Sequence, residues 1–507
     1  MRHTNKIGWV TVLLIATTGA SMAQSIDPPA RAARLNYLSG QVSFRPDAVE
    51  DWAAASLNYP LTTGDHLWTD PGAQTEMHVG STAIRMGPET ALAFLNLDDR
   101  AVQLSLTAGS LNVHILAMRP DETFEVDTPN AAVSLRPGDY RINVDGDRNA
   151  TWAIANAGEA DIAGGGAGFP VYPRQMAQLT GSDTLSQEIT PVPAPDGFDA
   201  WCRERQSREE SVVSARYVPR DMTGYEDLDA YGVWRNVPPY GWVWMPTSAP
   251  AGWAPYREGR WAWVDPWGWT WIDDEPWGFA PFHYGRWAFA GGAWVWAPGR
   301  LDAPVRPVYA PALVAFIGGP GFGVAAWFPL APGEVYRPAY QVSAVYVRQM
   351  NIAQVSDVTV IDRVNVENVR YANQAVPGAV VAVPRDAFVS ARPVAAAAVR
   401  MDAREAAAAP VIGMTAAVAP QRESVLAGPR RTSAPPARFA ERKVVMKSTP
   451  PPPQRALDAA PAARNDRPAV RLDEEHRPAP PAAKAAEERK SEAPRNEKKA
   501  NKKATRK

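Results

Sequence analysis

Residues 33–180 show apolar and polar side chains alternating in short runs that follow glycines. Examples are "SGQVSF" around Gly40, "PGDYRINV" around Gly138 and "AGEADI" around Gly158. A period of two residues is typical of β-strands with one buried face, and glycine supplies the positive backbone angles that tight turns need. The pattern predicts an all-β domain over residues 33–180.

Tryptophans dominate the next apolar pattern, in residues 219–300. Thirteen of the 19 tryptophans fall between Trp234 and Trp296, and the motifs around them recur at intervals of about 26 residues, as in structural repeats. The motifs "GVW", "GRW" and "GRW" are followed in turn by "GWVW", "GWTW" and "AWVW". The tryptophans of a repeat alternate, so they project to one side of a strand. Each repeat is therefore predicted to be a β-hairpin with cross-strand aromatic pairs, and the module to share an aromatic core.

A short amphipathic helix is predicted between these two regions, in residues 195–218. The stretch "GFDAWCRERQSREE" places Phe198, Trp201 and Cys202 on one face and charged residues on the others. Cys202 is the only cysteine, which excludes an intramolecular disulfide framework. With no histidine base nearby, it is expected to be a packed residue rather than a nucleophile.

Residues 301–395 are predicted to be a β-rich and loop-rich extension of the tryptophan module. The stretch "VTVIDRVNVENVRY" alternates valine with polar residues, which predicts a strand. Residues 310–331 carry no charge but are divided by "GGPG" at their centre. Such a break predicts a β-hairpin with a tight turn rather than a membrane-spanning helix.

The two ends of the chain predict export and disorder. Residues 1–23 combine basic residues, a short apolar stretch and "SMA", which is typical of a secretory signal peptide. No transmembrane span is predicted in the mature chain. Residues 401–507 are rich in Ala, Pro, Lys, Arg and Glu, a composition typical of a disordered tail. This tail holds 23 Lys and Arg against 13 Asp and Glu, so it is basic while the remainder of the chain is acidic.

The first region resembles a known family. The motifs "LSGQVSF", "LTTGDHLWTD", "LTAGSLNV" and "FEVDTPNAAVSLRPGDYRINV" occur in the order found in the FecR domain of exported and membrane proteins of Gram-negative bacteria. The resemblance implies an envelope-side β-domain that makes protein contacts, although "LRPGDYRI" departs from the family's usual glycine-threonine pair. Because a signal peptide is expected in place of a cytoplasmic module, the family's sigma-factor regulation is not expected here. The tryptophan module and its extension resemble an uncharacterised Trp-rich module that accompanies FecR domains.

The candidate chemistry lies in "PWGWTWIDDEPWGFAPFHYGRW". Asp273 and Glu275, with Asp274 between them, suggest the paired carboxylates of a glycosidase among sugar-stacking aromatics. Acids beside proline and glycine are also ordinary turn residues, and the other repeats have no acids here. No catalytic residue is therefore predicted.

Ligand contact is predicted for a small set of residues in the same stretch. Trp267 and Trp277 precede glycines in turns, so both are expected to be exposed. His283 is the only histidine of the module and is expected to be packed or to cap a neighbour. No metal or cofactor is predicted, because the acids lack the Asp/Gly loop of calcium sites. The predicted ligand-contact set is Trp267, Asp273, Asp274, Glu275, Trp277 and His283.

These observations predict a non-enzymatic protein of the periplasm or cell envelope that contacts an unidentified envelope protein or glycan. The basic tail suits an anionic envelope surface, whereas an acidic body and export argue against nucleic acid as a partner. One alternative is an envelope polysaccharide-acting enzyme that uses Asp273 and Glu275. Another is a signalling accessory related to FecR-type sensors. A row of exposed tryptophans would favour glycan binding, and burial of nearly all of them would favour a structural role.

Overall fold

The computed structural model describes residues 27–250, 252–300, 306–319, 322–427 and 432–452. The predicted signal peptide and residues 453–507, with the basic end of the predicted tail, lie outside the described residues. The chain is mainly β, which confirms the predicted fold class. All described residues belong to one compact unit. Among them, no helix has both the length and the apolar character that crossing a membrane requires.

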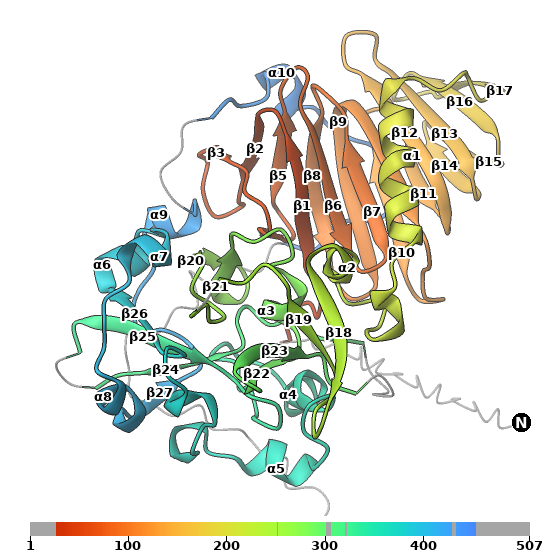
Figure 1. Cartoon of the computed structure of the whole chain (residues 1–507). Helices are drawn as coiled ribbons and strands as arrows, with labels where there is room; N and C mark the ends of the chain where they lie inside the picture. Colours follow the sequence, from red (N-terminus) through yellow and green to blue (C-terminus); the bar gives the residue numbers. More distant parts are fainter. Residues whose placement is uncertain (1–26, 251, 301–305, 320–321, 428–431, 453–507) are drawn as a thin grey trace, which may run out of the picture. The chain divides into compact units, whose positions relative to one another are not determined.

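The N-terminal region contains two β-sheets whose apolar faces share one core (Figure 1). The first sheet contains, in spatial order, β4 (Pro60–Leu61), β1 (Ala33–Ser39), β6 (Gln74–Val79), β7 (Thr82–Met86), β9 (Ala101–Ile115), β12 (Gly138–Asp145), β13 (Ala150–Ala157), β16 (Gln175–Thr180) and β17 (Ser186–Pro191). The second sheet contains β3 (Ala53–Ala54), β2 (Val42–Arg45), β5 (His66–Thr69), β8 (Ala91–Leu97), β9, β10 (Thr123–Asp127), β11 (Ala132–Leu135), β14 (Ala160–Gly164) and β15 (Ala167–Val171).

The long strand β9 belongs to both sheets. Its first half pairs with β8 and β10, and its second half pairs with β7 and β12. The strand passes from the second sheet to the first at Gly109, whose φ is +88°. A Cβ at that position would lie 2.3 Å from the hydroxyl of Thr90, so only glycine fits this crossing.

Helix α1 (Gly197–Glu210) lies across the polar face of the first sheet (Figure 1). It begins at a capping box between Asp196 and Asp199 and buries Phe198 and Cys202, as its apolar face predicts. Short helices η1 (Ser214–Arg216), η2 (Tyr225–Asp227) and α2 (Leu228–Tyr231) then lead into the tryptophan module.

The three tryptophan repeats are β-hairpins, as predicted. Their strands are β18 (Gly232–Val237) with β19 (Gly241–Pro246), β20 (Gly259–Val264) with β21 (Gly268–Asp273), and β22 (Arg286–Ala290) with β23 (Ala293–Ala297). In the second hairpin Trp261 lies opposite Trp271, and Trp263 lies opposite Trp269. The first and third hairpins join into one sheet in the order β18-β19-β23-β22, while the second hairpin is a separate sheet. Helix α3 (Ala280–His283) connects the second and third hairpins.

The remaining residues build a four-stranded sheet surrounded by short helices. Its order is β26 (Val381–Pro384), β25 (Val324–Pro329), β24 (Val314–Ile317) and β27 (Val411–Gly413), so the hairpin predicted within residues 310–331 is confirmed. The helices are α4 (Ala344–Asn351), α5 (Val358–Arg363), η3 (Val366–Asn368), η4 (Asn373–Ala375), α6 (Arg385–Val389), α7 (Val394–Ala397), α8 (Ala403–Ala408) and α9 (Arg422–Val425). The last helix, α10 (Ala437–Ala440), lies instead against the N-terminal strands, where Phe439 stacks on Trp68.

The strand predicted from the alternating valines is wrong, because this stretch forms α5 and η3. The side chain of Asp357 accepts a hydrogen bond from the Thr359 backbone nitrogen and so caps α5. Within α5 only Ile361 is buried, while Val358 and Val360 are 40% and 44% exposed. No sheet therefore packs against the alternating valines of α5, and they are not buried as one face.

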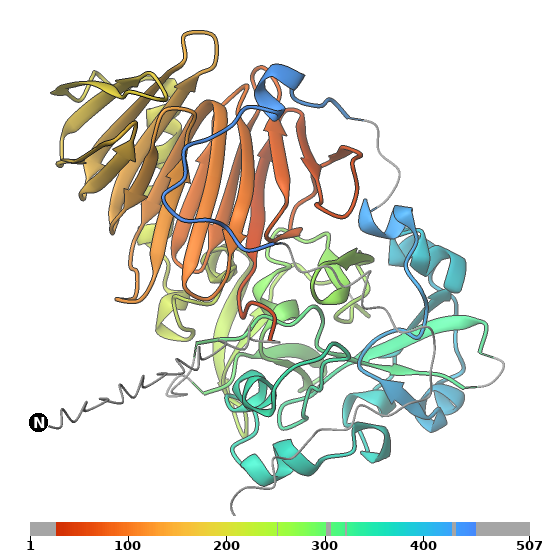
Figure 2. The ribbon, with the colours of Figure 1, turned by 180° about the vertical axis from the view of Figure 1, so that it is seen from behind.

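The folded part extends past the predicted boundary at residue 401. Strand β27 pairs with β24, and Val411 and Met414 belong to a buried apolar cluster. Figure 2, the view from behind, shows the last described segment, in blue, crossing in front of the N-terminal strands. There the side chain of Gln103 donates to the carbonyl of Ser448 over 2.8 Å. A few apolar residues spaced through a polar sequence are enough to hold this segment against surfaces that other parts of the chain provide.

Candidate functional site

Trp267 and Trp277 are buried, so their predicted exposure is wrong. They are 4% and 1% exposed. Trp267 packs against Tyr309 with ring centroids 4.6 Å apart, and Trp277 lies 4.9 Å from Trp244 of the first hairpin. The turns that carry them fold back onto the aromatic core instead of facing solvent. Nearly all tryptophans of the module are buried, which favours the structural role for this set.

The acidic triplet forms a turn that packs against the N-terminal sheets. Asp273 is 2% exposed; its Oδ2 accepts from Trp271 Nε1 (2.9 Å) and its Oδ1 from the Glu275 backbone nitrogen (3.0 Å). The side chain of Asn58 donates to the carbonyls of Asp273 and Glu275, at 2.9 and 2.7 Å. The exposed carboxylate of Asp274 pairs with Arg260 over 3.0 Å.

Burial raises the pKa of the Asp273 carboxyl well above its ordinary value, and the neighbouring carboxylates of Asp274 and Glu275 add to the effect. Hydrogen bonds from Trp271 and the Glu275 backbone oppose it. The structure therefore brings the predicted pair Asp273 and Glu275 together, but both oxygens of Asp273 are engaged in holding the turn.

His283 is fully buried and is packed, as predicted. Its Nδ1 is 2.8 Å from the carbonyl of Ala310, and its ring lies against Phe279 and Tyr309. Burial lowers the pKa of His283 to about 3, so the imidazole is neutral at ordinary pH. It lines a small cavity of about 50 Å³ together with Arg286. His283 and the acidic triplet contact different residues, so they do not form one site.

Cys202 is also buried. Burial raises the pKa of its thiol to about 12. It therefore remains a protonated thiol, as expected for a packed residue rather than a nucleophile.

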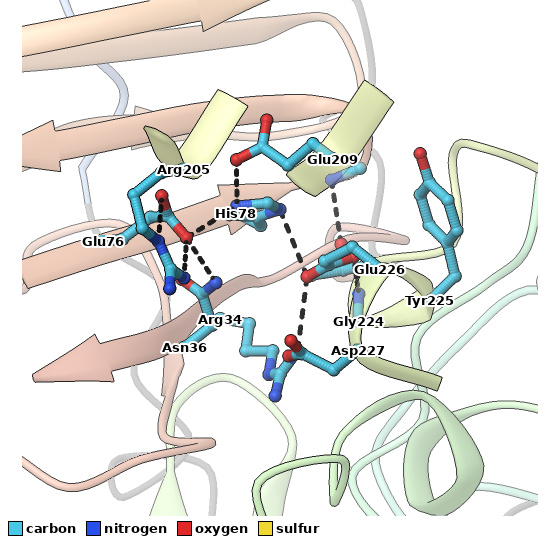
Figure 3. A network of polar contacts seen from close by, with 12 residues as sticks. Arg34, Asn36, Glu76, His78, Arg205, Glu209, Gly224, Tyr225, Glu226 and Asp227 are labelled. Atoms are coloured by element: carbon cyan, nitrogen blue, oxygen red, sulfur yellow. Dashed lines mark hydrogen bonds and ion pairs between the residues drawn. The ribbon is translucent and has the colours of Figure 1, made fainter. Parts of the chain in front are cut away.

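A network of buried charged side chains joins the first sheet, α1 and the segment that leads into the first hairpin (Figure 3). We call it the ionic network. Its members are Arg34 of β1, Glu76 and His78 of β6, Arg85 of β7, Arg205 and Glu209 of α1, and Glu226 and Asp227 of η2.

His78 lies at the centre of the ionic network, with its side chain 4% exposed. Its Nδ1 is 3.1 Å from Glu226, and its Nε2 is 3.3 Å from Glu76 and 3.4 Å from Glu209. Burial by itself lowers the pKa of His78, but the carboxylates of Glu226 and Glu209 outweigh burial and hold it well above the ordinary value. Because both ring nitrogens face carboxylates, the arrangement suits a doubly protonated imidazolium.

Arginines form ion pairs with the carboxylates around His78. Arg85 donates from Nε to Glu76 over 2.6 Å and contacts Glu209 through Nη2. Arg205 Nη2 lies 2.5 Å from the other oxygen of Glu76. Burial raises the pKa of Glu76, but His78, Arg205 and Arg85 outweigh that effect and hold it well below its ordinary range.

Glu76, His78 and Glu209 also have donor atoms within 4.8 Å of one another, close enough to hold a metal ion. Metal binding would require a neutral His78 and would bring a second cation beside Arg85 and Arg205. The two arginines already supply the positive charge that these carboxylates need. The geometry therefore favours an ionic joint between elements rather than a metal centre.

Sequence reasoning missed this network because its members come from positions 34 to 227. One signal was present. In "TEMHV" and "TAIRM" the outward positions of two adjacent strands are Glu76, His78, Arg85 and Ala83. A strand face on which three of four side chains can carry a charge indicates that another element covers it and pairs with it.

One aromatic surface stays open on the first hairpin. It consists of Tyr217, Trp234 and Trp242, and we call it the open aromatic surface. The ring of Tyr217 lies 4.6 Å from Trp234 and 4.8 Å from Trp242. Trp242 is 48% exposed, whereas the residues at its position in the other hairpins, Trp269 and Trp294, are 3% and 6% exposed. Among the described residues β18 pairs only with β19, so its outer edge is open.

A family model described as "Family of unknown function (DUF6600)" matches residues 225–334. The match begins at Tyr225, next to Glu226 and Asp227 of the ionic network, and it covers the three hairpins and β24–β25. It brings no activity with it.

Two crystal structures of a candidate anti-sigma factor from Parabacteroides distasonis ATCC 8503 are similar to part of the chain. The identity is 11% and the TM-score 0.24 in both cases. The matches cover 27% of this chain and 63% and 64% of those chains, so the chain matches less than two thirds of either. No curated protein matches the sequence.

Proposed function

We propose that this protein is a non-enzymatic interaction protein of the cell envelope, which contacts a partner polypeptide through the open aromatic surface. The main observation in support of this proposal is the exposure of Trp242, which occupies a motif position that is buried in both other hairpins. Exposed aromatic side chains, tryptophan and tyrosine above all, are enriched at the centres of protein interfaces.

The edge of β18 supports a polypeptide as the partner. An open strand edge presents backbone donors and acceptors to which an extended segment can pair. Val233 of β18 is 38% exposed and Tyr240 of the adjoining turn is 37% exposed, so apolar contacts continue along this hairpin. A partner strand beside β18 would gain main-chain hydrogen bonds there.

The envelope location rests on the predicted signal peptide and on the resemblance of residues 33–180 to the FecR domain. The non-enzymatic assignment is supported by the engagement of Asp273 in the turn it holds. The ionic network supports a role as a scaffold, because it ties the N-terminal sheets to the first hairpin with buried charge pairs.

Site-specific photo-cross-linking tests this proposal. A photoreactive amino acid at Trp242 should capture a partner in intact envelopes, and the purified partner should bind the wild-type chain. Trp242→Ala should weaken that binding by about tenfold or more, as expected for an interface hot spot. Tyr172→Ala is the matched control, because Tyr172 is 51% exposed on another part of the chain. Equal binding by the wild-type chain and Trp242→Ala would refute the proposed surface.

A separate assay addresses the enzyme alternative. The purified chain and Glu275→Gln are incubated with envelope polysaccharide, and new reducing ends are measured. We expect no release by either protein. Release by the wild-type chain that disappears in Glu275→Gln would contradict the non-enzymatic assignment.

A further inference from the structure

A second site lies away from the tryptophan module, in a groove between α1 and the strands β12, β13 and β16. The groove has a volume of about 670 Å³, within the range of roughly 300–1,000 Å³ typical of small-molecule sites. Its walls are the outward face of the first sheet, the extended residues 192–195 and the first turns of α1. The helix lies beside these strands in Figure 1.

The floor of the groove carries an aromatic ring beside an amide. In the register of the sheet Trp152 lies opposite Asn143, and both residues line the groove. Outward positions of neighbouring strands lie roughly 4.5–5.5 Å apart at Cβ, so the two side chains lie side by side. Trp152 is half-buried, with the remainder of its surface available to the groove.

The polar atoms of these two side chains keep free hydrogen-bonding capacity. Asn143 Oδ1 accepts from Arg141 Nε over 3.0 Å. Among the described residues, the Asn143 amide nitrogen and the Trp152 indole nitrogen make no hydrogen bond. The Asn143 amide therefore offers both of its donors, and its oxygen keeps a second lone pair.

The charge of the groove disfavours an anionic ligand. Arg141 is already paired with Asp196 at 2.8 Å and with Asp199 at 2.9 Å. Asp139 lines the groove as a third carboxylate, and it accepts from the side chains of Asn112 and Asn156. A phosphate or sulfate group would meet more carboxylates than free guanidinium groups.

The backbone of the groove floor disfavours a polypeptide. Strand β12 is paired with β9 and β13, β13 with β12 and β16, and β16 with β13 and β17. No edge is open for strand addition among these strands, so the floor of the groove offers a ligand its side chains rather than its backbone. This is the opposite of the situation at β18.

The geometry points to this groove as a binding site for an uncharged saccharide. One face of a pyranose ring carries C–H groups that pack against the electron-rich face of an indole ring. The hydroxyls around its rim both donate and accept hydrogen bonds, and the amide of Asn143, beside Trp152, is placed to match them. The site is independent of the open aromatic surface and adds a glycan ligand to the proposed polypeptide partner.

Ligand-observed NMR titration with three neutral trisaccharides, namely maltotriose, cellotriose and triacetylchitotriose, tests this inference on the purified mature chain. At least one should bind saturably, with a dissociation constant of about 0.1–1 mM. Trp152→Ala should weaken binding by about tenfold or more, whereas Trp152→Phe, which keeps an aromatic ring, should retain part of it. Asn143→Ala should weaken binding about fivefold or more.

Trp242→Ala serves as the control, because it alters the open aromatic surface and should leave saccharide binding unchanged. Retained partner binding by Trp152→Ala would show that this variant is folded and that the two sites are separate. The inference is overturned if none of the three saccharides binds, if Trp152→Ala binds as tightly as the wild-type chain, or if inorganic phosphate displaces the bound saccharide.

Discussion

The first and second tryptophan hairpins share one motif but have opposite surroundings. In the second hairpin Trp269 donates from Nε1 to the carbonyl of Val418 and lies 4.5 Å from the ring of Phe388. These two covering residues come from the C-terminal part of the chain. In the first hairpin Trp242 occupies the same motif position, and its ring contact is with Tyr217 on the segment before the hairpin.

The two hairpins are also held in different ways. The second is surrounded by aromatic rings, whereas the first follows directly on Glu226 and Asp227 of the ionic network. The motif therefore specifies the hairpin and its cross-strand pairs. Whether the tryptophans are buried or exposed depends on whether another segment covers the hairpin.

Truncation of the covered tryptophan should have the largest effect on stability. We expect Trp269→Ala to lower the free energy of unfolding by about 3–5 kcal/mol, because it leaves a cavity against Phe388. Urea titration of the wild-type and variant chains measures the change. A loss of similar size in Trp242→Ala would remove the distinction between the two hairpins.

The ionic network that precedes the first hairpin should make the free energy of unfolding depend on pH. The folded chain holds the pKa of His78 above its value of 6.5 in the unfolded chain. Its contribution is therefore complete below pH 6.5 and is lost as pH rises toward the folded pKa, by up to about 1.4 kcal/mol per pH unit.

The test compares the wild-type chain with His78→Gln between pH 6.5 and 8.5. The difference in unfolding free energy should shrink as pH rises, because only the wild-type chain loses a stabilising proton. In the wild-type chain Glu76, Glu209 and Glu226 remain ionised over this range, since His78 and the neighbouring arginines lower their pKa values against the effect of burial. A difference that stays constant with pH would show that His78 is not protonated in the network.

Asp273, an acid that only the second repeat has, should stabilise the turn that follows β21. Asp273→Asn replaces one acceptor oxygen with an NH₂ group, which must face either the Trp271 indole N–H or the Glu275 backbone N–H. A buried donor that loses its acceptor costs about 1–3 kcal/mol. Thermal unfolding should show this loss, whereas the control Asp274→Asn should stay within about 0.5 kcal/mol because Asp274 is exposed. Unchanged stability in Asp273→Asn would contradict the role of the turn.

Trp242→Ala should have the smallest effect on stability, within about 1 kcal/mol, since nearly half of the residue faces solvent. The same variant should bind the purified partner about tenfold more weakly or worse than the wild-type chain. Stability and binding are thus expected to separate at Trp242, whereas Trp269→Ala should affect the fold first. A strongly destabilised Trp242→Ala chain would place this residue in the core.

Several elements could be predicted because their signals are local. Alternation with period two identified the N-terminal strands, and the repeated tryptophan motifs identified three hairpins with their cross-strand pairs. The same local logic failed at residues 358–363, where alternating valines form α5. A period of two describes which side chains share a face, but it does not supply a sheet for that face to cover.

The candidate sites could be predicted less well because they depend on contacts between distant segments. The turn positions of Trp267 and Trp277 suggested exposure, yet Tyr309 and Trp244 cover them. The ionic network and the saccharide groove combine residues of separate strands with residues of α1, and no spacing along the chain brings them together.

Local sequence is enough to specify the β-rich class, the strand periodicity, the apolar face of α1 and the hairpin repeats, because each depends on neighbours a few residues apart. Tertiary packing is needed to specify which charged residues meet around His78, which tryptophans are buried and which ring stays exposed. Burial and ion pairing each require two surfaces in contact. The residues of one strand face are set by that strand, whereas the segment that covers the face depends on how the whole chain packs.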